Sequence, residues 1–281
     1  MSNNTLSHTN FFQKHIALPQ QHGAWAIWLG PYVIGIGVSS TLLKPGLLWL
    51  TLASLGGFFA LQPLAILVKV LAGRRSRADL TPALFWIIVY GLMTLIGALG
   101  LILTGNAFIL WLGLAALPVL AWQMWLVARR EERGQTGVEI VGAGVLCMAA
   151  PAALWVDTGS MSAVGWWLLA QCWLQGAGAI VYIYLRLEHR RMTTLPHWPE
   201  RLKLGRRSTL YNVTNIIIVA ALAAFGVAPW GVLVAFVAML VEAVYGGLLR
   251  PGIGAKPSSI GVRQIMVTVV FAALMIAAYR L

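Results

Sequence analysis

The sequence has few charged residues, and acidic residues are the scarcest of them. Only 10% of its 281 residues are charged, and eight are Asp or Glu. Soluble domains usually carry about 25% charge, whereas a charged side chain at the centre of a bilayer costs at least about 2.5 kcal/mol. With 59% hydrophobic residues and a mean hydropathy of +0.80, the composition excludes an ordinary soluble domain and predicts an all-α polytopic membrane protein.

Residues that carry recognisable chemistry are also scarce. Cys147 and Cys172 both lie in apolar runs without metal-type spacing, which indicates core packing. His189 and His197 are eight residues apart without supporting ligands, so no metal site is predicted. The sequence offers no nucleophile–base pair, haem-type histidine pair or nucleotide motif, and the cofactor is left unassigned.

Long apolar runs dominate what is present, and a span needs about 20 such residues. Residues 1–20 are polar and mixed, unlike a cleavable signal peptide, so the run from Ala24 is predicted to be the first span. We therefore expect a cytoplasmic tail (1–22) followed by a single transmembrane helical domain (23–281). The runs predict nine spans, at residues 23–42, 46–70, 82–103, 106–128, 137–156, 162–186, 208–227, 229–249 and 261–279.

The basic residues predict the orientation of these spans. Of the 20 Lys and Arg residues, all but Lys44 and Arg280 fall in the tail or in every second loop. The positive-inside rule then places the N-terminus in the cytoplasm and the C-terminus outside, in a bacterial inner membrane. Basic loops beside anionic headgroups explain the net charge of +12, so membrane lipids rather than nucleic acid are the expected partners.

Polar residues cluster in the cytoplasmic half of the predicted spans. Glu242 lies eight residues before Arg250, about 12 Å into the membrane. Buried polar groups need partners or water. Two interpretations remain open: these groups line one cavity that opens to the cytoplasm, or each amide joins two neighbouring helices. Four amides lie at comparable depths, about 10 to 16 Å: Asn215, Gln175, Gln123 and Gln62.

The predicted span 162–186 carries a polar face. Its members recur at steps of three or four, so they share one narrow side of a helix. That face either lines a site or packs against other helices. The members are Gln171, Gln175, Gly178, Tyr182 and Arg186.

Two residues at predicted cytoplasmic rims have both a local and a functional interpretation. Glu139 follows Thr136 by three residues, which suits a capping box, yet it also suits an acid that serves a site. His22 lies at the entrance of the first span. A lone histidine there is usually structural, but it is also a candidate ligand.

The segment Pro19-Gln20-Gln21-His22-Gly23-Ala24-Trp25 resembles the N-terminal signature of the YwiC-like family of bacterial membrane proteins. The run from Arg129 to Arg133, followed by Glu139, is similar to the central loop of that family. The resemblance implies no established activity, and it raises His22, Arg133 and Glu139 as candidate site residues.

The expected architecture also looks like that of the UbiA-type prenyltransferases. In that superfamily, the loops after the second and sixth helices carry aspartate-rich motifs that hold magnesium against a prenyl diphosphate. Here the first of these loops offers only Asp79, and the second offers Glu188 and Glu200. Magnesium needs cooperating carboxylates, so the magnesium-dependent reaction is not expected. Arginines remain suited to holding a phosphate or carboxylate directly.

These observations lead to one main hypothesis and two alternatives. The main one is a UbiA-like bundle that binds or modifies an anionic lipid or an isoprenoid-type molecule. Arg74, Arg133 and Arg186 would hold the head group, and Gln175, Asn215 and Glu242 would line the cavity. One alternative is a transporter with a first helix broken at Gly30-Pro31, near Gly35 and Gly37. The other is a non-catalytic membrane assembly subunit.

Overall fold

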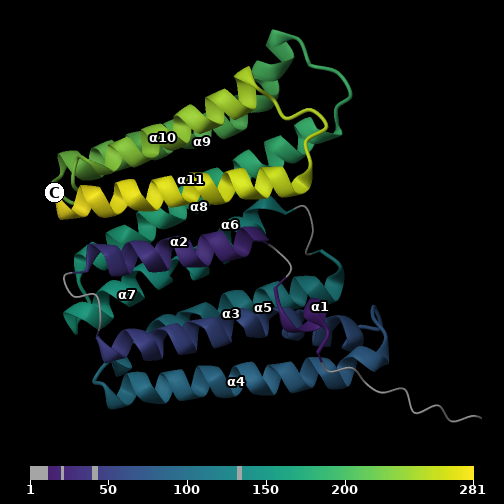
Figure 1. Cartoon of the computed structure of the whole chain (residues 1–281), viewed down its shortest axis with the longest axis vertical. Helices are drawn as coiled ribbons and strands as arrows, with labels where there is room; N and C mark the ends of the chain where they lie inside the picture. The colour runs from purple at the N-terminus through teal and green to yellow at the C-terminus, as the bar shows by residue number, and fades with distance from the viewer. Residues whose placement is uncertain (1–11, 20–21, 40–43, 132–134) are drawn as a thin grey trace, which may run out of the picture. The chain divides into compact units, whose positions relative to one another are not determined.

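The computed structural model describes residues 12–19, 22–39, 44–131 and 135–281. Within these ranges the chain is helical and has no strand, which confirms the predicted all-α class (Figure 1). Among the described residues, eight helices are long and apolar enough to cross a membrane, and a ninth apolar helix is shorter. The chain is therefore a multi-pass membrane protein, with about the predicted number of helices.

The helices form two compact units. The first comprises residues up to Gln21 and the range Pro45–Gly134, and the second comprises His22–Lys44 and Gln135–Leu281. The first unit contains α1 (Lys14–Ala17), α3 (Pro45–Leu71), the 3₁₀ turn η1 (Arg77–Asp79), α4 (Leu80–Leu103), the 3₁₀ turn η2 (Ala107–Ile109) and α5 (Leu110–Arg129).

Glycines allow the close approach of α3 and α4 in the first unit. A Cβ on Gly97 would collide with the α3 backbone at Ala53, and one on Gly100 would overlap the Trp49 ring. Such close contacts between small residues are typical of helix packing in membranes, where the lipid offers no hydrophobic driving force for association.

The second unit holds the remaining helices, and α2 lies beside α11 in it (Figure 1). Its elements are α2 (His22–Val38), α6 (Thr136–Cys147), α7 (Ala149–Thr158), α8 (Ala163–Arg191), α9 (Trp198–Ala224), α10 (Val232–Val244), the π-helical turn η3 (Tyr245–Leu249) and α11 (Pro257–Arg280).

The predicted break in the first apolar helix is wrong, because α2 is continuous through Pro31. Its glycines serve packing instead. A Cβ on Gly35 would collide with the backbone of α7 at Ala150, and one on Gly37 would overlap the Ile276 side chain of α11. The glycine-rich stretch therefore lets α7 and α11 approach α2.

The predicted span 137–156 is divided at Met148 into α6 and α7. Pro151 lies in the first turn of α7 and has no amide hydrogen to donate to the carbonyl of Cys147. The α7 helix is buried, with Trp155 fully enclosed and its Nε1 donating to the Ser162 carbonyl at 3.2 Å.

The long basic loop expected at residues 187–207 is also wrong. The α8 helix continues to Arg191 and α9 begins at Trp198, so only residues 192–197 connect them. Pro199 in the first turn of α9 favours that early start. The span criterion detects only the apolar part of a helix, whereas these helices extend into charged sequence.

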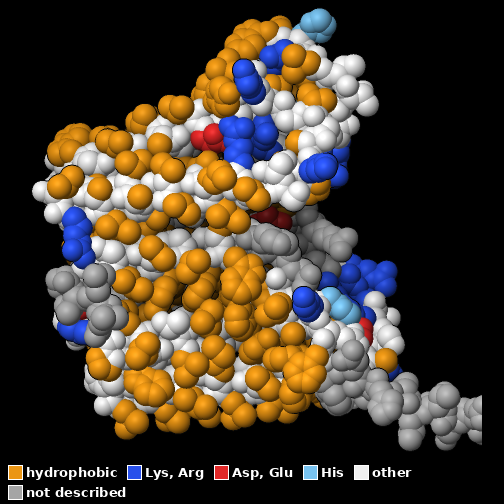
Figure 2. All heavy atoms as spheres, viewed as in Figure 1, with side chains coloured by type: hydrophobic (Ala, Val, Ile, Leu, Met, Phe, Trp, Pro, Cys, Tyr) orange, Lys and Arg blue, Asp and Glu red, His pale blue; other side chains and the backbone are white. Residues whose placement is uncertain are grey.

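Basic side chains gather at one end of the second unit, near the connection from α8 to α9 (Figure 2). The two basic residues predicted for the other side have specific partners. Lys44 lies 3.6 Å from the carboxylate of the buried Asp157, and Arg280 donates to the Gly37 carbonyl at 2.8 Å. These partners account for both departures from the positive-inside pattern, and the orientation itself stays a prediction.

Candidate functional site

The acid predicted within a span, Glu242, forms an ion pair between helices. The Arg263 side chain of α11 donates from Nε to Oε1 at 2.6 Å and from a terminal nitrogen to Oε2 at 2.8 Å. The Tyr182 hydroxyl of α8 donates to Oε1 at 2.8 Å. Forked contacts of this kind are among the stronger polar interactions in proteins. They tie α8, α10 and α11 together.

A π-helical turn follows this acid directly. In η3 the Arg250 amide donates to the Tyr245 carbonyl, five residues earlier, at 2.7 Å. A Cβ on Gly246 would overlap the Tyr182 hydroxyl, so only glycine lets that hydroxyl reach Glu242. Single π turns within helices are frequent at functional sites.

Arg186 supports the same turn from α8. Its terminal nitrogen donates to the Gly246 carbonyl at 2.6 Å and to the Arg250 carbonyl at 3.0 Å. The side chain is only 6% exposed, and its Nε has no hydrogen-bond partner among the described residues. Arg186 thus places a buried positive charge beside η3, where two backbone carbonyl oxygens accept its hydrogen bonds.

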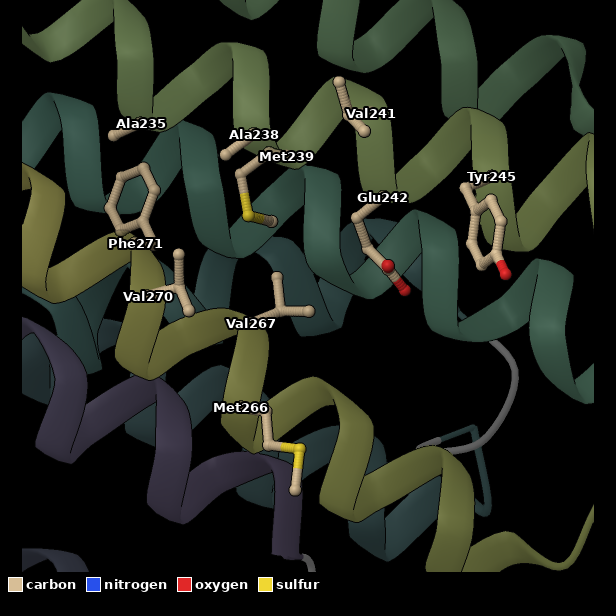
Figure 3. Close-up of a pocket in the computed structure, with 10 residues that line it drawn as sticks. All are labelled: Ala235, Ala238, Met239, Val241, Glu242, Tyr245, Met266, Val267, Val270 and Phe271. Carbon is tan, nitrogen blue, oxygen red and sulfur yellow. The ribbon is translucent and has the colours of Figure 1, made fainter.

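A cavity of about 260 Å³ opens between α10 and α11, and we call it the α10–α11 groove (Figure 3). The carboxylate of Glu242 points toward α11 at one end of the groove, where Tyr245 also lies. Met266, 63% exposed, and Val241, 61% exposed, show that the groove reaches the outer surface of the unit. The rest of its lining is apolar: Ala235, Ala238, Met239, Val267, Val270 and Phe271.

Positive charge exceeds negative charge around η3, next to the groove, whose own charged lining residue is Glu242. The guanidinium carbon of Arg263 lies 5.5 Å from the centre of the Tyr245 ring, and that of Arg250 lies 5.9 Å from it. With Arg186, three guanidinium groups surround η3, and among the described residues Glu242 is the carboxylate that bonds to one of them. The arrangement is suited to an anionic group.

The polar face of α8 is buried and packs against other helices. Asn215 of α9 donates to the Leu174 carbonyl at 2.9 Å. Gly178 lies against Asn215, and Gln171 accepts from the Tyr279 hydroxyl at 3.0 Å. Gln175 is buried on the same face, at 6% exposure. Helix packing thus accounts for much of this face, while Tyr182 and Arg186 connect it to η3.

None of the contacts described for the other predicted site residues joins them to this site. Arg74 belongs to the first unit, where it donates to the Val127 carbonyl. Arg133 lies outside the described residues, as does the side chain of His22. Glu139 is exposed and accepts from the Tyr184 hydroxyl at 2.7 Å.

The predicted capping box at Thr136 is wrong. Thr136 is the first helical residue, and the cap position falls on Gln135, without a side-chain cap bond in the described structure. Two of the amides predicted at the depth of Glu242, Gln62 and Gln123, belong to the first unit, whereas Glu242, Gln175 and Asn215 belong to the second. Gln62 donates to the His15 carbonyl at 2.8 Å.

Sequence reasoning missed Arg263 as the partner of Glu242. Arg263 was expected in the last basic loop, but α11 begins at Pro257 and includes it. The sequence nevertheless held a clue to this partnership, because Arg263 lies inside the predicted span 261–279. An arginine within a span needs an acid or a carbonyl as a partner. Within the described residues no group of three His, Cys, Asp or Glu side chains is placed to hold a metal ion.

Comparison with known proteins supports the resemblance predicted from the sequence. Residues 18–154 match the model of the YwiC-like protein family. The chain is also 25% identical over 182 residues, 64% of its length, to the "Uncharacterized protein YwiC" of Bacillus subtilis (strain 168), covering 71% of that protein. No solved structure matches significantly. The family match ends before α8, so the ion pair and η3 lie beyond it, and the likeness to UbiA-type enzymes stays a prediction.

Proposed function

We propose that the chain is a multi-pass protein of the bacterial inner membrane that binds an anionic lipid. The resemblance to the YwiC-like family over residues 18–154 supports the bacterial membrane setting, and the groove supports the ligand. The lipid tail, acyl or isoprenoid, lies in the α10–α11 groove, and its head group lies at η3. The observation that carries this proposal is the surplus of guanidinium groups around η3, beside a groove whose lining is apolar apart from Glu242 and Tyr245.

The apolar part of the groove suits a hydrocarbon chain. Met266 and Val270 are more than half exposed, so a tail can enter sideways from the bilayer without crossing water. Phe271 and Met239 are buried and form the inner wall. Methionine side chains adapt readily to the shape of an apolar ligand.

The polar end suits a phosphate or carboxylate. Glu242 balances the charge of Arg263, which leaves the exposed Arg250 and the buried Arg186 without an acid in the contacts described above. Guanidinium groups bind phosphate oxygens in forked geometry. In this proposal Arg250 contacts the head group, whereas Arg186 is a positioning residue that holds η3.

Lipid retention tests the proposal. The full chain is purified in mild detergent with equal amounts of phosphatidylglycerol and phosphatidylcholine, and bound lipid is counted by native mass spectrometry. Val267→Phe fills the groove, and Arg250→Gln removes one guanidinium contact worth about 1.5–3 kcal/mol, or roughly 10- to 100-fold in affinity. Both should lose phosphatidylglycerol. The matched control is Val234→Phe, because Val234 is exposed on α10 outside the groove.

Equal retention of the two lipids, together with unchanged retention in Val267→Phe, would overturn the proposal. The alternative is a transporter, which the intramembrane ion pair favours because buried acids mark ion pathways in many carriers. Gradient-driven flux in reconstituted vesicles that is lost in Glu242→Gln would favour this alternative.

A further inference from the structure

The short helix α1 lies against α3 and α4 in the first unit (Figure 1). Ile16 has no exposed surface and packs against apolar side chains of these two helices. Phe12, just before α1, contacts the rings of Phe85 and Trp86 edge to face, at centroid distances of 6.4 and 5.9 Å. The segment from Phe12 to Pro19 thus covers one end of the α3–α4 pair, and we call it the α1 strap. The side chains beneath Ile16 are Ile66, Val70 and Ala83, flanked by Leu80 and Trp86.

Two polar side chains of the long helices donate to the backbone of this strap. Nε2 of Gln62 in α3 donates to the His15 carbonyl at 2.8 Å, and the Tyr90 hydroxyl of α4 donates to the Ala17 carbonyl at 2.9 Å. The last carbonyls of a helix have no partner within it, and in one-turn α1 these include His15 and Ala17. Pro19, four residues after His15, has no amide hydrogen to offer. The strap therefore supplies two carbonyl acceptors that its own helix cannot use.

Both donors lie inside predicted spans, where a polar group needs a partner. Gln62 is seven residues before Lys69, about 10 Å along α3. An unpaired donor in the hydrocarbon region is costly. Gln62 is half-buried, so its amide group is reachable beside the strap, whereas Tyr90 is buried and its hydroxyl bonds to the strap. Whatever replaces the strap must therefore supply hydrogen-bond acceptors to both side chains.

The strap makes few contacts for its length. A single helical turn is not stable by itself, so α1 depends on its contacts with α3 and α4. Docking orders eight residues against their conformational entropy. The buried side chains of α1 are Ile16 and Ala17, and Phe12 remains 74% exposed despite its ring contacts. Segments with so few buried contacts open more readily than the core around them.

The membrane offers acceptors that could replace those of the strap. A glycerolipid carries two ester carbonyl oxygens where its chains meet the head group, at the edge of the hydrocarbon region. That edge corresponds to the depth of Gln62 below the charged end of α3. The first methylene groups of the lipid chains also suit the apolar side chains that Ile16 covers. Water supplies acceptors too, but it would leave these apolar side chains exposed.

We infer that the α3–α4 surface beneath the α1 strap is a binding site for an ester-linked glycerolipid. The ester carbonyls of the lipid accept the hydrogen bonds of Gln62 and Tyr90 and displace the strap. Lipid binding is thereby coupled to release of the N-terminal segment. The inference does not rest on the lipid proposed for the α10–α11 groove, because the strap and its donors belong to the first unit and the groove belongs to the second.

Thiol labelling in nanodiscs measures release of the strap. The full chain carries Ala17→Cys, at a position that is 7% exposed in the docked strap. A water-soluble maleimide is added to nanodiscs of dioleoyl phosphatidylglycerol or of its ether-linked analogue, which has the same head group and chains but no carbonyl. One net hydrogen bond changes an equilibrium constant about fivefold. Labelling should therefore be roughly 5- to 25-fold faster in the ester lipid.

Two reference measurements accompany this comparison. His15→Cys, at an exposed position of the same strap, corrects for access of the reagent in each lipid. The unmodified chain gives the background from Cys147 and Cys172, which are both buried.

Variants of the donors separate lipid binding from simple loosening of the strap. Gln62→Leu combined with Tyr90→Phe removes both donors at nearly constant volume. The strap then docks less firmly in either lipid, so Ala17→Cys should label faster, but at equal rates in the two lipids. The matched control is Thr94→Val, because the Thr94 hydroxyl donates within α4, to the Tyr90 carbonyl at 2.8 Å. It should preserve the faster labelling in the ester lipid.

Two results would overturn the inference. Equal labelling of Ala17→Cys in ester and ether lipids would mean that the strap does not respond to ester carbonyls. A preference for the ester lipid that survives loss of both donors would place the lipid effect elsewhere in the chain. A preference that disappears in the double variant and persists in Thr94→Val would support the site.

Discussion

The ion pair between Glu242 and Arg263 should couple α10 to α11 strongly enough to be measured. The perturbation is a double-mutant cycle of Glu242→Gln, Arg263→Gln and both together. Glu242→Gln keeps the side-chain volume and removes the charge, so the forked contact at 2.6 and 2.8 Å loses its ionic character. The cycle isolates the pair from effects that each substitution has elsewhere.

The expected magnitude follows from burial and geometry. Hydrogen bonds to charged groups contribute about 1.5–3 kcal/mol in proteins, whereas polar pairs between membrane helices average about 0.6 and reach about 1.7 kcal/mol. The Arg263 side chain is 33% exposed and that of Glu242 is 17% exposed, so part of the attraction is screened. We expect each single variant to lower the free energy of unfolding by about 2 kcal/mol and the pair to couple by about 1.5 kcal/mol.

The assay is unfolding in mixed micelles at increasing dodecyl sulfate, followed by circular dichroism. The double variant should lose about 2.5 kcal/mol, less than the sum of the single losses. Arg263→Lys should recover part of the coupling, because lysine keeps the charge without the fork. The matched pair Arg75 and Asp79 has similar exposure but lies within one short segment, so it should couple by no more than about 0.5 kcal/mol.

Additive losses for Glu242 and Arg263, within about 0.5 kcal/mol, would refute this reasoning. They would mean that the two side chains are solvated separately rather than bonded to each other. A coupling equal to that of the control pair would have the same meaning.

Three further outcomes concern close packing and a buried charge. Gly246→Ala should lower stability by about 1–3 kcal/mol, because its Cβ would overlap the Tyr182 hydroxyl, and thermal unfolding in detergent measures the loss. Gly97→Ala should lower stability by a similar amount, because its Cβ would push α4 away from α3. The control is Gly91→Ala, which faces open space and should leave stability unchanged or raise it in the same assay. Equal losses of stability in the two variants would contradict the packing argument. Asp157→Asn should cost about 1–3 kcal/mol at neutral pH, since Asp157 is 2% exposed and faces Lys44, and an unchanged unfolding midpoint would contradict the ion pair.

The helical architecture was predictable because the bilayer imposes a simple length requirement. Apolar runs of about 20 residues mark spans whatever packs around them. The same criterion misplaced the ends of α8 and α9, because helices continue past the apolar region when charged residues also favour the helix. Pro151 divides α6 from α7 in a run whose hydropathy is uniform.

The site was predictable in part. Glu242 was identified because an acid in an apolar run needs a partner. Its partners were not, since Tyr182 and Arg263 lie 60 and 21 residues away, and one sequence does not show which helix faces fall opposite each other. Glu139 shows the opposite error, in which a local pattern hid a contact with a distant residue. The spacing from Thr136 suggested a capping box, whereas the Glu139 carboxylate accepts a hydrogen bond from Tyr184 of α8.

The π-helical turn at Tyr245–Leu249 has a consequence for the register of the chain. A π turn is an α-helix with one extra residue, and each residue of an α-helix turns the chain by about 100°. Deleting one residue from this turn would restore an α-helix and rotate Glu242 away from α11 while Arg250 stayed in place. The extra residue thus acts as a spacer: it lets Glu242 face Arg263 while the carbonyls of Gly246 and Arg250 face Arg186.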